Sequence, residues 1–130
     1  MVKDIPTIGG ICLKYIALKS KIHSAKVTKR DYKYEGSIEI DQDLLDAANL
    51  KAYEKVLVAN FTNGYRYETY VIPGERNSGI ICVSGGGARY SCIGDTVTIF
   101  SFGVYNKNEV PHPIVVLVDE HNKIRERLRK

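Results

Sequence analysis

The sequence predicts a mainly β domain in which six or seven short strands close into a small barrel. Three observations support this fold class. Apolar and polar residues alternate in stretches such as Ser37-Ile38-Glu39-Ile40-Asp41, a pattern typical of half-buried strands. Glycine, proline and asparagine separate these stretches at short intervals. Nine of the 130 residues are tyrosine, and aromatic side chains favour strands. Because closure removes exposed sheet edges, we expect a barrel rather than an open sheet.

One short helix is expected among the strands, over residues 44–48. Asp41-Gln42-Asp43 comes directly before it and supplies an Asp cap and an acidic first turn, and Asn49 ends the helix. The remaining periodic stretches read as strands, with a turn at Arg30-Asp31. The expected strands cover residues 19–28, 32–40, 55–61, 65–72, 79–83, 96–102 and 114–118.

Turn signals separate these strands. Asn63-Gly64 is the strongest short hairpin signal in the chain, and Pro73-Gly74 is expected to end its return strand. The polar stretch 105–109 reads as a loop, and the charged tail from Glu120 onward as helical or frayed. The sequence shows no internal repeat and no domain linker, so we expect a single domain over residues 1–130.

Composition excludes several classes of function. The net charge of +4 is diffuse and forms no basic stripe interleaved with aromatic residues, which argues against nucleic-acid binding. No apolar run reaches the length of a membrane span, and residues 1–13 make a poor signal peptide. The three cysteines form no CxxC pair, and no spacing of His, Cys, Asp or Glu resembles a metal site. We therefore expect a cytoplasmic protein without a metal ion.

The stretch Tyr34-Glu35-Gly36-Ser37 allows two interpretations. A Gly-Ser pair entering a strand is commonly a turn or a bulge. It can also be a chemical site, because Gly36 leaves its carbonyl open to approach and the Ser37 hydroxyl lies within reach of that carbonyl. If the hydroxyl is activated and the oxyanion stabilised, the chain can attack itself.

Two further stretches are ambiguous in the same way. On the strand that follows Asn63-Gly64, alternation places Arg66, Glu68 and Tyr70 on one face, which is either a solvent-exposed hairpin or a binding surface. The run Ser84-Gly85-Gly86-Gly87-Ala88 is either a flexible bend or a row of unshielded N–H groups that can face an anion. No Gly-Lys-Ser/Thr follows the glycines, so a P-loop is excluded.

Taken together, these stretches resemble the pyruvoyl-dependent aspartate 1-decarboxylases. The resemblance keeps the order and spacing of the family over most of the chain, although residues 1–13 precede the usual family start. The residues that carry it are Lys19-Ser20-Lys21-Ile22-His23, Ala25-Lys26-Val27-Thr28, Tyr34-Glu35-Gly36-Ser37, Ile40-Asp41-Gln42-Asp43-Leu44, Asp46-Ala47-Ala48, Asn63-Gly64, Arg66, Thr69-Tyr70, Gly74-Glu75-Arg76 and Gly94-Asp95.

The resemblance implies a six-stranded double-psi β-barrel with one or two short helices, assembled as a homotetramer with active sites between subunits. It also implies self-cleavage between Gly36 and Ser37, giving a β chain of residues 1–36 and an α chain of residues 37–130. Ser37 would become a covalent pyruvoyl group, whose Schiff base with L-aspartate allows decarboxylation to β-alanine and CO2 for pantothenate synthesis. Some members of the family need a helper protein to mature, so a maturation factor is a candidate partner.

The family also implies roles for individual residues. Ser37 and Tyr70 would be catalytic, with Tyr70 as proton donor, and Thr69 would stabilise the oxyanion of self-cleavage next to Gly36. The substrate would be bound by Lys21, Tyr34, Arg66, Thr69, Gly85, Gly86 and Gly87.

One departure and one alternative accompany these expectations. The family usually has Asn-Gly-Ala-Ala-Ala where this chain has Ser84-Gly85-Gly86-Gly87-Ala88, which removes an amide donor and raises the cost of ordering the loop. The alternative function is an uncleaved, non-catalytic double-psi barrel that acts as a binding or interaction module. It explains the fold but gives no reason for Ser37, Arg66, Thr69 and Tyr70 to occur together.

Overall fold

The structure is a computed structural model that describes residues 13–130 and folds most of them into strands. In chain order the elements are β1 (Lys14–Lys26), β2 (Lys29–Asp31), β3 (Ser37–Asp41), α1 (Gln42–Ala47), β4 (Lys55–Asn60), β5 (Arg66–Gly74), β6 (Ile81–Ser84), the 3-10 helix η2 (Gly85–Arg89), β7 (Thr96–Asn106), β8 (Ile114–Val118) and β9 (Ile124–Arg129).

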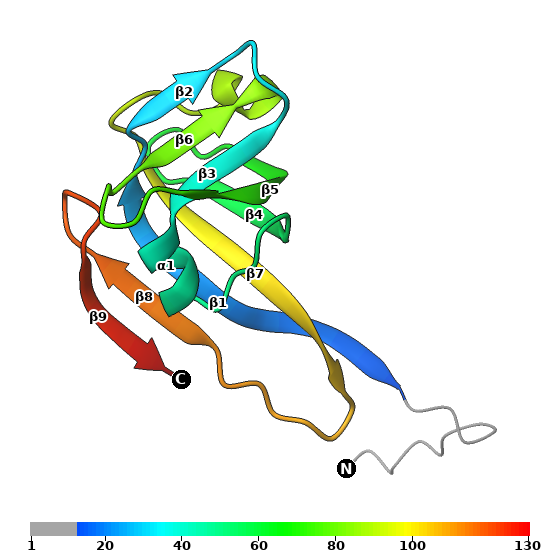
Figure 1. Cartoon of the computed structure of the whole chain (residues 1–130). Helices are drawn as coiled ribbons and strands as arrows, with labels where there is room; N and C mark the ends of the chain where they lie inside the picture. The colour runs from blue at the N-terminus through cyan, green and yellow to red at the C-terminus, as the bar shows by residue number, and fades with distance from the viewer. Residues whose placement is uncertain (1–12) are drawn as a thin grey trace.

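The nine strands pair in the order β2-β6-β3-β5-β4-β7-β1-β8-β9. Three pairs are parallel, namely β1 with β8, β2 with β6 and β3 with β5, and the other pairs are antiparallel. Figure 1 shows β1 and β7 as a long ribbon that extends beyond the other strands, while β2, β6 and β3 lie at the opposite end of the molecule. The parallel pairs arise from connections that cross between distant parts of the sheet.

The core forms where alternate residues of the strands face inward. Ile38 and Ile40 of β3 and Ile81 and Val83 of β6 are all 0% exposed and belong to one apolar cluster. Because successive side chains of a strand point to opposite faces, Ser37 lies on the side of β3 that faces away from this cluster. The remaining buried apolar residues come mainly from the other strands and α1: Ile22, Ala25, Val27, Leu44, Leu45, Ala48, Leu50, Val56, Val58, Val71, Ala88, Val97, Ile99, Ile114, Val116 and Val118.

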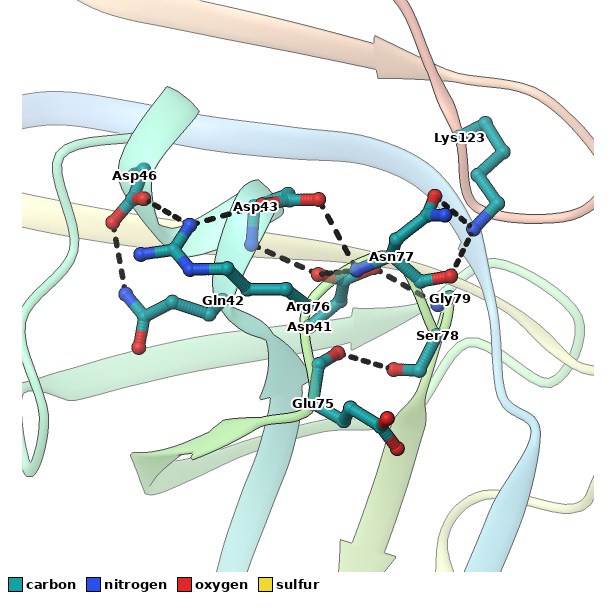
Figure 2. Close-up of polar contacts among 10 residues, drawn as sticks. All are labelled: Asp41, Gln42, Asp43, Asp46, Glu75, Arg76, Asn77, Ser78, Gly79 and Lys123. Atoms are coloured by element: carbon teal, nitrogen blue, oxygen red, sulfur yellow. Dashed lines mark hydrogen bonds and ion pairs between the residues drawn. The ribbon is translucent and has the colours of Figure 1, made fainter.

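The C-terminal end of β3 is fixed by the buried side chain of Asp41, which is 2% exposed. One carboxylate oxygen accepts hydrogen bonds from the Asp43 N–H (2.8 Å) and the Asn77 N–H (3.2 Å), and the other accepts from the Gly79 N–H (2.9 Å). Figure 2 shows how these bonds tie the start of α1 to the loop between β5 and β6. Asp41 therefore holds β3 in place from the end opposite to Ser37.

An exposed ion pair supports the same junction. The Arg76 guanidinium lies 2.9 Å from an Asp43 oxygen and 2.7 Å from an Asp46 oxygen (Figure 2). Its hydrogen bond to Asp46 lowers the pKa of that carboxyl below its ordinary value. Since these side chains are largely exposed, their contribution to stability is small.

The mainly β fold class and the short helix with an Asp cap are confirmed; the helix begins at Gln42, earlier than expected, and its cap is Asp41. The expected number of six or seven strands and the expected closed barrel are not confirmed. The described residues form nine strands rather than six or seven, and β2 and β9 lie at the two ends of the sheet with no pairing between them. Within residues 13–130, no helix is long and apolar enough to cross a membrane.

Several element boundaries differ from the sequence-based expectation. Of the expected strand over residues 32–40, only the part from Ser37 onward is strand, in β3, and residues 32–36 form the bend before it. The expected turn at Arg30-Asp31 is wrong, because both residues belong to β2. The expected stop at Pro73-Gly74 is wrong, because both residues belong to β5. β5 pairs there in parallel with β3, where Ile40 faces Pro73 and Asp41 faces Gly74.

The chain beyond Thr96 also forms more strand than expected. β7 runs on to Asn106, through the start of the stretch expected to be a loop, because it pairs with the first residues of β1. The tail is neither helical nor frayed: β9 pairs with β8 along residues 124–129. Main-chain pairing explains this strand, since its charged side chains stay exposed at the sheet edge.

Candidate active site

Ser37 is the first residue of β3 and is 1% exposed. Its Oγ is buried and has no hydrogen-bond partner among the residues that the structure describes. Buried polar groups in proteins are nearly always hydrogen-bonded, so an orphaned hydroxyl points to a functional or strained position. Gly36, which precedes it, is exposed. The peptide bond between the two residues thus joins an accessible glycine to a buried, unpaired serine.

Ser84 lies directly opposite Ser37, because the two residues are Cα partners in the antiparallel pair of β3 and β6. Directly opposed residues place their side chains on the same face of a sheet. Ser84 is 6% exposed, and its Oγ lies 3.8 Å from the Cys82 sulfur. The family's asparagine is therefore replaced by a buried hydroxyl on the face that also carries the Ser37 side chain.

The glycines of η2 have three different environments. Gly85 has a φ of +69°, and a Cβ built on it would lie 2.6 Å from the Gly36 Cα. A Cβ on Gly86 would meet no atom within 4 Å, and one on Gly87 would lie 2.9 Å from the Tyr67 ring. The expected flexible bend is therefore an ordered 3-10 turn. Its first glycine touches the peptide that precedes Ser37.

Tyr34 lies beside the same peptide. It belongs to the bend between β2 and β3, its side chain is 55% exposed, and its carbonyl oxygen would be 3.1 Å from a Cβ on Gly85. Together with Glu39 and Ser84, it lines a pocket of about 230 Å³. The pocket adjoins the start of β3, because Ser84 is the Cα partner of Ser37 and Glu39 is two residues further along the same strand.

Tyr70 and Thr69 reach this region through the parallel pair of β3 and β5. Ile38 is the Cα partner of Val71. Extending this register backward places Ser37 beside Tyr70 and Gly36 beside Thr69. Both residues of β5 are half-buried. The predicted catalytic tyrosine and oxyanion threonine thus neighbour the predicted cleavage position along the chain, on opposite faces of β5.

Arg66 and Lys21 form a second group around Phe100. The Arg66 guanidinium carbon lies 5.9 Å from the centroid of the Phe100 ring, and Lys21 is the Cα partner of Phe100 across β1 and β7. Within residues 13–130, neither cation forms a salt bridge with an acidic side chain. Arg66, Phe100 and Tyr65 line a pocket of about 330 Å³. Arg66 at this pocket, with Lys21 on the neighbouring strand β1, suits a negatively charged ligand.

The two groups lie at separate pockets. Arg66 precedes Tyr70 by four residues on β5, which is about 13 Å at roughly 3.3 Å per residue. The pocket beside Tyr34 and the pocket beside Arg66 share no lining residue. The predicted site residues therefore fall into two groups at separate pockets, which we call half-sites.

Some residues of the site escaped the sequence reasoning. Tyr67 is half-buried against Gly87, and its hydroxyl lies 2.7 Å from the Ser91 Oγ. Burial raises the pKa of the Tyr67 phenol, which keeps it protonated at neutral pH. Phe100 contacts Arg66 through its ring. Strand alternation puts Tyr67 on the face of β5 opposite Arg66, but no pattern in the sequence marks Tyr67 as buried or pairs Phe100 with Arg66.

These features describe a small, mainly β protein with a candidate active site assembled from Ser37, the neighbouring η2 turn and a cationic pocket. The family model for aspartate decarboxylase matches residues 13–125, and the chain belongs to this family. The resemblance found in the sequence is thereby confirmed.

Similar proteins agree with this family. The chain is 47% identical over 114 residues to the aspartate 1-decarboxylase of Lactiplantibacillus plantarum, covering 86% of this chain and 88% of that protein. It is 50% identical over 109 residues to the aspartate 1-decarboxylase of Acetivibrio thermocellus, covering 82% and 86%. It is 48% identical over 112 residues to that of Thermosipho africanus, covering 86% and 93%.

Proposed function

We propose that this protein is an aspartate 1-decarboxylase that converts L-aspartate to β-alanine and CO2 after cleaving itself between Gly36 and Ser37. The observation that carries the proposal is the buried Ser37 Oγ, which has no hydrogen-bond partner within residues 13–130 and lies next to the exposed Gly36. Because no hydrogen bond has to be given up first, this hydroxyl is available to attack the adjacent carbonyl. The β-alanine would enter pantothenate synthesis, as the family implies.

Self-cleavage balances without an external oxidant or reductant. The Ser37 Oγ bonds to the Gly36 carbonyl carbon, the Gly36–Ser37 C–N bond breaks, and the nitrogen takes up a proton, which leaves an ester. Loss of the Ser37 Cα proton and cleavage of its Cβ–Oγ bond release the Gly36 carboxylate, giving chains 1–36 and 37–130. Water then replaces the nitrogen of the remaining enamine, ammonia leaves, and a pyruvoyl group remains.

The residues around Ser37 fit this product. Gly85 leaves room against Gly36 because it has no Cβ, and Tyr34 and Ser84 line the adjoining pocket. When present, a pyruvoyl group supplies a carbonyl that accepts the electron pair left on the substrate Cα as CO2 departs. Thr69, beside Gly36 in the extended register, would donate a hydrogen bond to the oxyanion during cleavage.

The remaining residues would bind and protonate the substrate. Arg66 would hold the carboxylate that is retained, because a guanidinium donates two parallel hydrogen bonds to a carboxylate. Lys21 would add positive charge from β1. Gly85, Gly86 and Gly87 would donate backbone N–H groups. Tyr70 would return a proton to Cα, since it neighbours Ser37 in the extended register.

The distance between the half-sites supports an assembly of several subunits. The Cα atoms of Arg66 and Tyr70 lie about 13 Å apart along β5, and the pocket beside Arg66 shares no lining residue with the pocket beside Tyr34. We therefore propose that Arg66 and Lys21 of one subunit face Ser37 and Tyr70 of another in a homotetramer.

We also propose that the fold is a double-psi β-barrel. The parallel pairs β1–β8, β2–β6 and β3–β5 are compatible with this topology.

The proposal also includes the cellular setting. Cys82 and Cys92 are free thiols, which suits a reducing cytoplasm. A maturation factor would act on the Gly36–Ser37 peptide if the chain alone cleaves slowly. The non-catalytic binding module, in contrast, has no support from the family to which the chain belongs.

Intact-mass analysis together with a β-alanine assay tests the function. Purified protein incubated at 37 to 60 °C should yield fragments 1–36 and 37–130, the larger one reactive with a carbonyl reagent and blocked to Edman degradation. The cleaved protein should form β-alanine from L-aspartate. Activity from a chain that remains whole and traps no carbonyl reagent would overturn the proposal. So would a protein that stays whole and inactive both alone and in a cell extract containing maturation factors.

A further inference from the structure

Gly85 was predicted to bind substrate through its N–H group, but its contacts indicate another role. We propose that Gly85 is a positioning residue for self-cleavage, whose missing Cβ allows its backbone to press on Gly36 and hold the scissile carbonyl against the Ser37 hydroxyl. This inference rests on the proposed self-cleavage and specifies which residue outside the cleaved pair sets its geometry.

The contact is one backbone against another. A Cβ on Gly85 would lie 2.6 Å from the Gly36 Cα, 2.7 Å from the Gly36 nitrogen and 3.1 Å from the Tyr34 carbonyl oxygen. Real Cβ atoms essentially never approach other atoms below 3.0 Å. None of these three atoms belongs to a flexible side chain that could turn away. Any side chain at position 85 would therefore displace the peptide that carries the scissile bond.

Other glycines of the site lack this constraint. A Cβ built on Gly36 itself, or on Gly86, would meet no atom within 4 Å. A Cβ on Gly87 would meet the side chain of Tyr67 at 2.9 Å, so among these glycines only Gly85 lies this close to backbone atoms, and it also has a φ of +69°. The preceding residue, Ser84, is paired with Ser37 across β3 and β6, so the end of β6 touches both sides of the scissile bond.

The size of the displacement predicts the size of the effect. Moving the Gly36 Cα from 2.6 Å to an ordinary contact of 3.4 Å shifts it by about 0.8 Å. Attack by the Ser37 Oγ requires the reacting atoms to be held within a few tenths of an ångström of the productive geometry. A misplacement of about 1 Å costs on the order of 100-fold in rate. We expect Gly85→Ala to slow self-cleavage by about that factor.

Three variants separate this effect from backbone strain. Gly85→Ala adds a Cβ and also strains the left-handed φ. Gly85→Asn adds a Cβ with a residue that tolerates a left-handed φ better. Gly94→Ala is the matched control, because Gly94 has a φ of +93° and a Cβ there would meet no atom within 4 Å. Each precursor is purified, its thermal unfolding is measured, and its self-cleavage rate is followed by intact mass.

A second measurement tests the chemical step itself. Hydroxylamine attacks the ester carbonyl of Gly36, expels the Ser37 hydroxyl, and leaves a Gly36 hydroxamate and a fragment that begins with serine. Trapping should be rapid in the wild-type precursor and in Gly94→Ala. In both Gly85 variants it should be slowed about as much as self-cleavage, because the ester forms rarely. A general loss of stability would not produce this pattern.

Every outcome decides the inference. Slow cleavage and slow trapping in folded Gly85→Asn, with wild-type rates in Gly94→Ala, support it. Wild-type rates in either folded Gly85 variant, or failure of both variants to fold, would overturn it while the proposed function stands. Equal slowing in Gly94→Ala would also overturn it, because strain alone would then explain the loss. If the wild-type protein does not cleave, the proposed function fails first and the inference with it.

Discussion

Ser37 and Ser84 lie opposite each other in the antiparallel pair of β3 and β6, yet the Ser37 Oγ makes no hydrogen bond within the described part of the chain. A buried hydroxyl in this state contributes no hydrogen bond to stability. It is retained at a cost, and the reaction proposed for Ser37 explains why. Removing the Ser37 hydroxyl should therefore affect self-cleavage but not the stability of the fold, and a single substitution can measure both effects.

Ser37→Ala should therefore abolish self-cleavage without weakening the fold. The variant loses the nucleophile but no hydrogen bond, so its unfolding midpoint should be no lower than that of wild-type precursor isolated before cleavage. Thermal unfolding and intact mass measure the two effects. Ser20→Ala is the control, because the buried Ser20 Oγ lies 2.6 Å from the Ser101 Oγ, and its loss should cost about 1 to 3 kcal/mol. A Ser37→Ala protein as destabilised as Ser20→Ala would contradict the orphaned state of the hydroxyl.

Arg66→Lys should weaken substrate binding and leave self-cleavage unchanged. Lysine keeps the charge but loses the planar fork that binds a carboxylate bidentately, and it loses stacking on Phe100. Hydrogen bonds to charged groups contribute about 1.5 to 3 kcal/mol, so kcat/KM for aspartate should fall by roughly 10- to 100-fold, mainly through KM. Steady-state kinetics on fully cleaved protein provide the measurement.

Glu68→Gln controls for this substitution on the same face of β5. Its ion pair with Lys55 spans 2.9 Å between side chains that are 62% and 74% exposed, so it contributes little. The variant should keep the wild-type KM. An Arg66→Lys enzyme with an unchanged KM would remove the assigned carboxylate role.

Much of the fold could be predicted from local sequence patterns. The alternation in Ser37–Asp41 predicted β3, and Asn63-Gly64 predicted the hairpin that joins β4 to β5, where Gly64 has a φ of +80°. The charged tail carried no comparable signal, because β9 is held by main-chain pairing with β8 and keeps its side chains in solvent. Sequence reasoning from side-chain periodicity misses such a strand.

The candidate site, like the fold, could be predicted only in part from the sequence. The family resemblance pointed to Ser37, Arg66, Thr69 and Tyr70, but strand alternation could not show that Arg66 lines a different pocket from Tyr34 and Ser84. Strand alternation also could not show that the consecutive glycines Gly85, Gly86 and Gly87 have different surroundings. The contact of Gly85 with Gly36 joins residues 49 positions apart, and it follows from tertiary structure.

Asp41→Ala should be strongly destabilising. The buried carboxylate accepts hydrogen bonds from the backbone N–H groups of Asp43, Asn77 and Gly79, and alanine would leave all three without this acceptor (Figure 2). The expected loss is about 3 kcal/mol or more in the free energy of unfolding, measured by urea denaturation in a Ser37→Ala background. Asp46→Asn serves as the exposed control and should shift the urea midpoint far less. Similar shifts in both variants would argue against Asp41 as the residue that fixes the end of β3.

Stability at alkaline pH should depend on Tyr67. Burial raises the pKa of its phenol in the folded state above the value of about 10 expected in the unfolded chain. Below pH 10 the phenol is protonated in both states, and its contribution is fully present. As the pH rises through the folded pKa, the unfolded chain releases its proton first, so the unfolded state binds fewer protons and stability is lost.

Tyr67→Phe removes this ionisation together with the hydrogen bond to Ser91. The variant should be about 1 kcal/mol less stable than its parent near pH 8, and the difference should shrink or reverse toward pH 11. Thermal unfolding from pH 8 to 11, again in the Ser37→Ala background, measures both curves. Tyr32→Phe, which removes a phenol from a side chain that is 52% exposed, should not reproduce this narrowing. Parallel curves for Tyr67→Phe and its parent would show that burial of the phenol does not govern its ionisation.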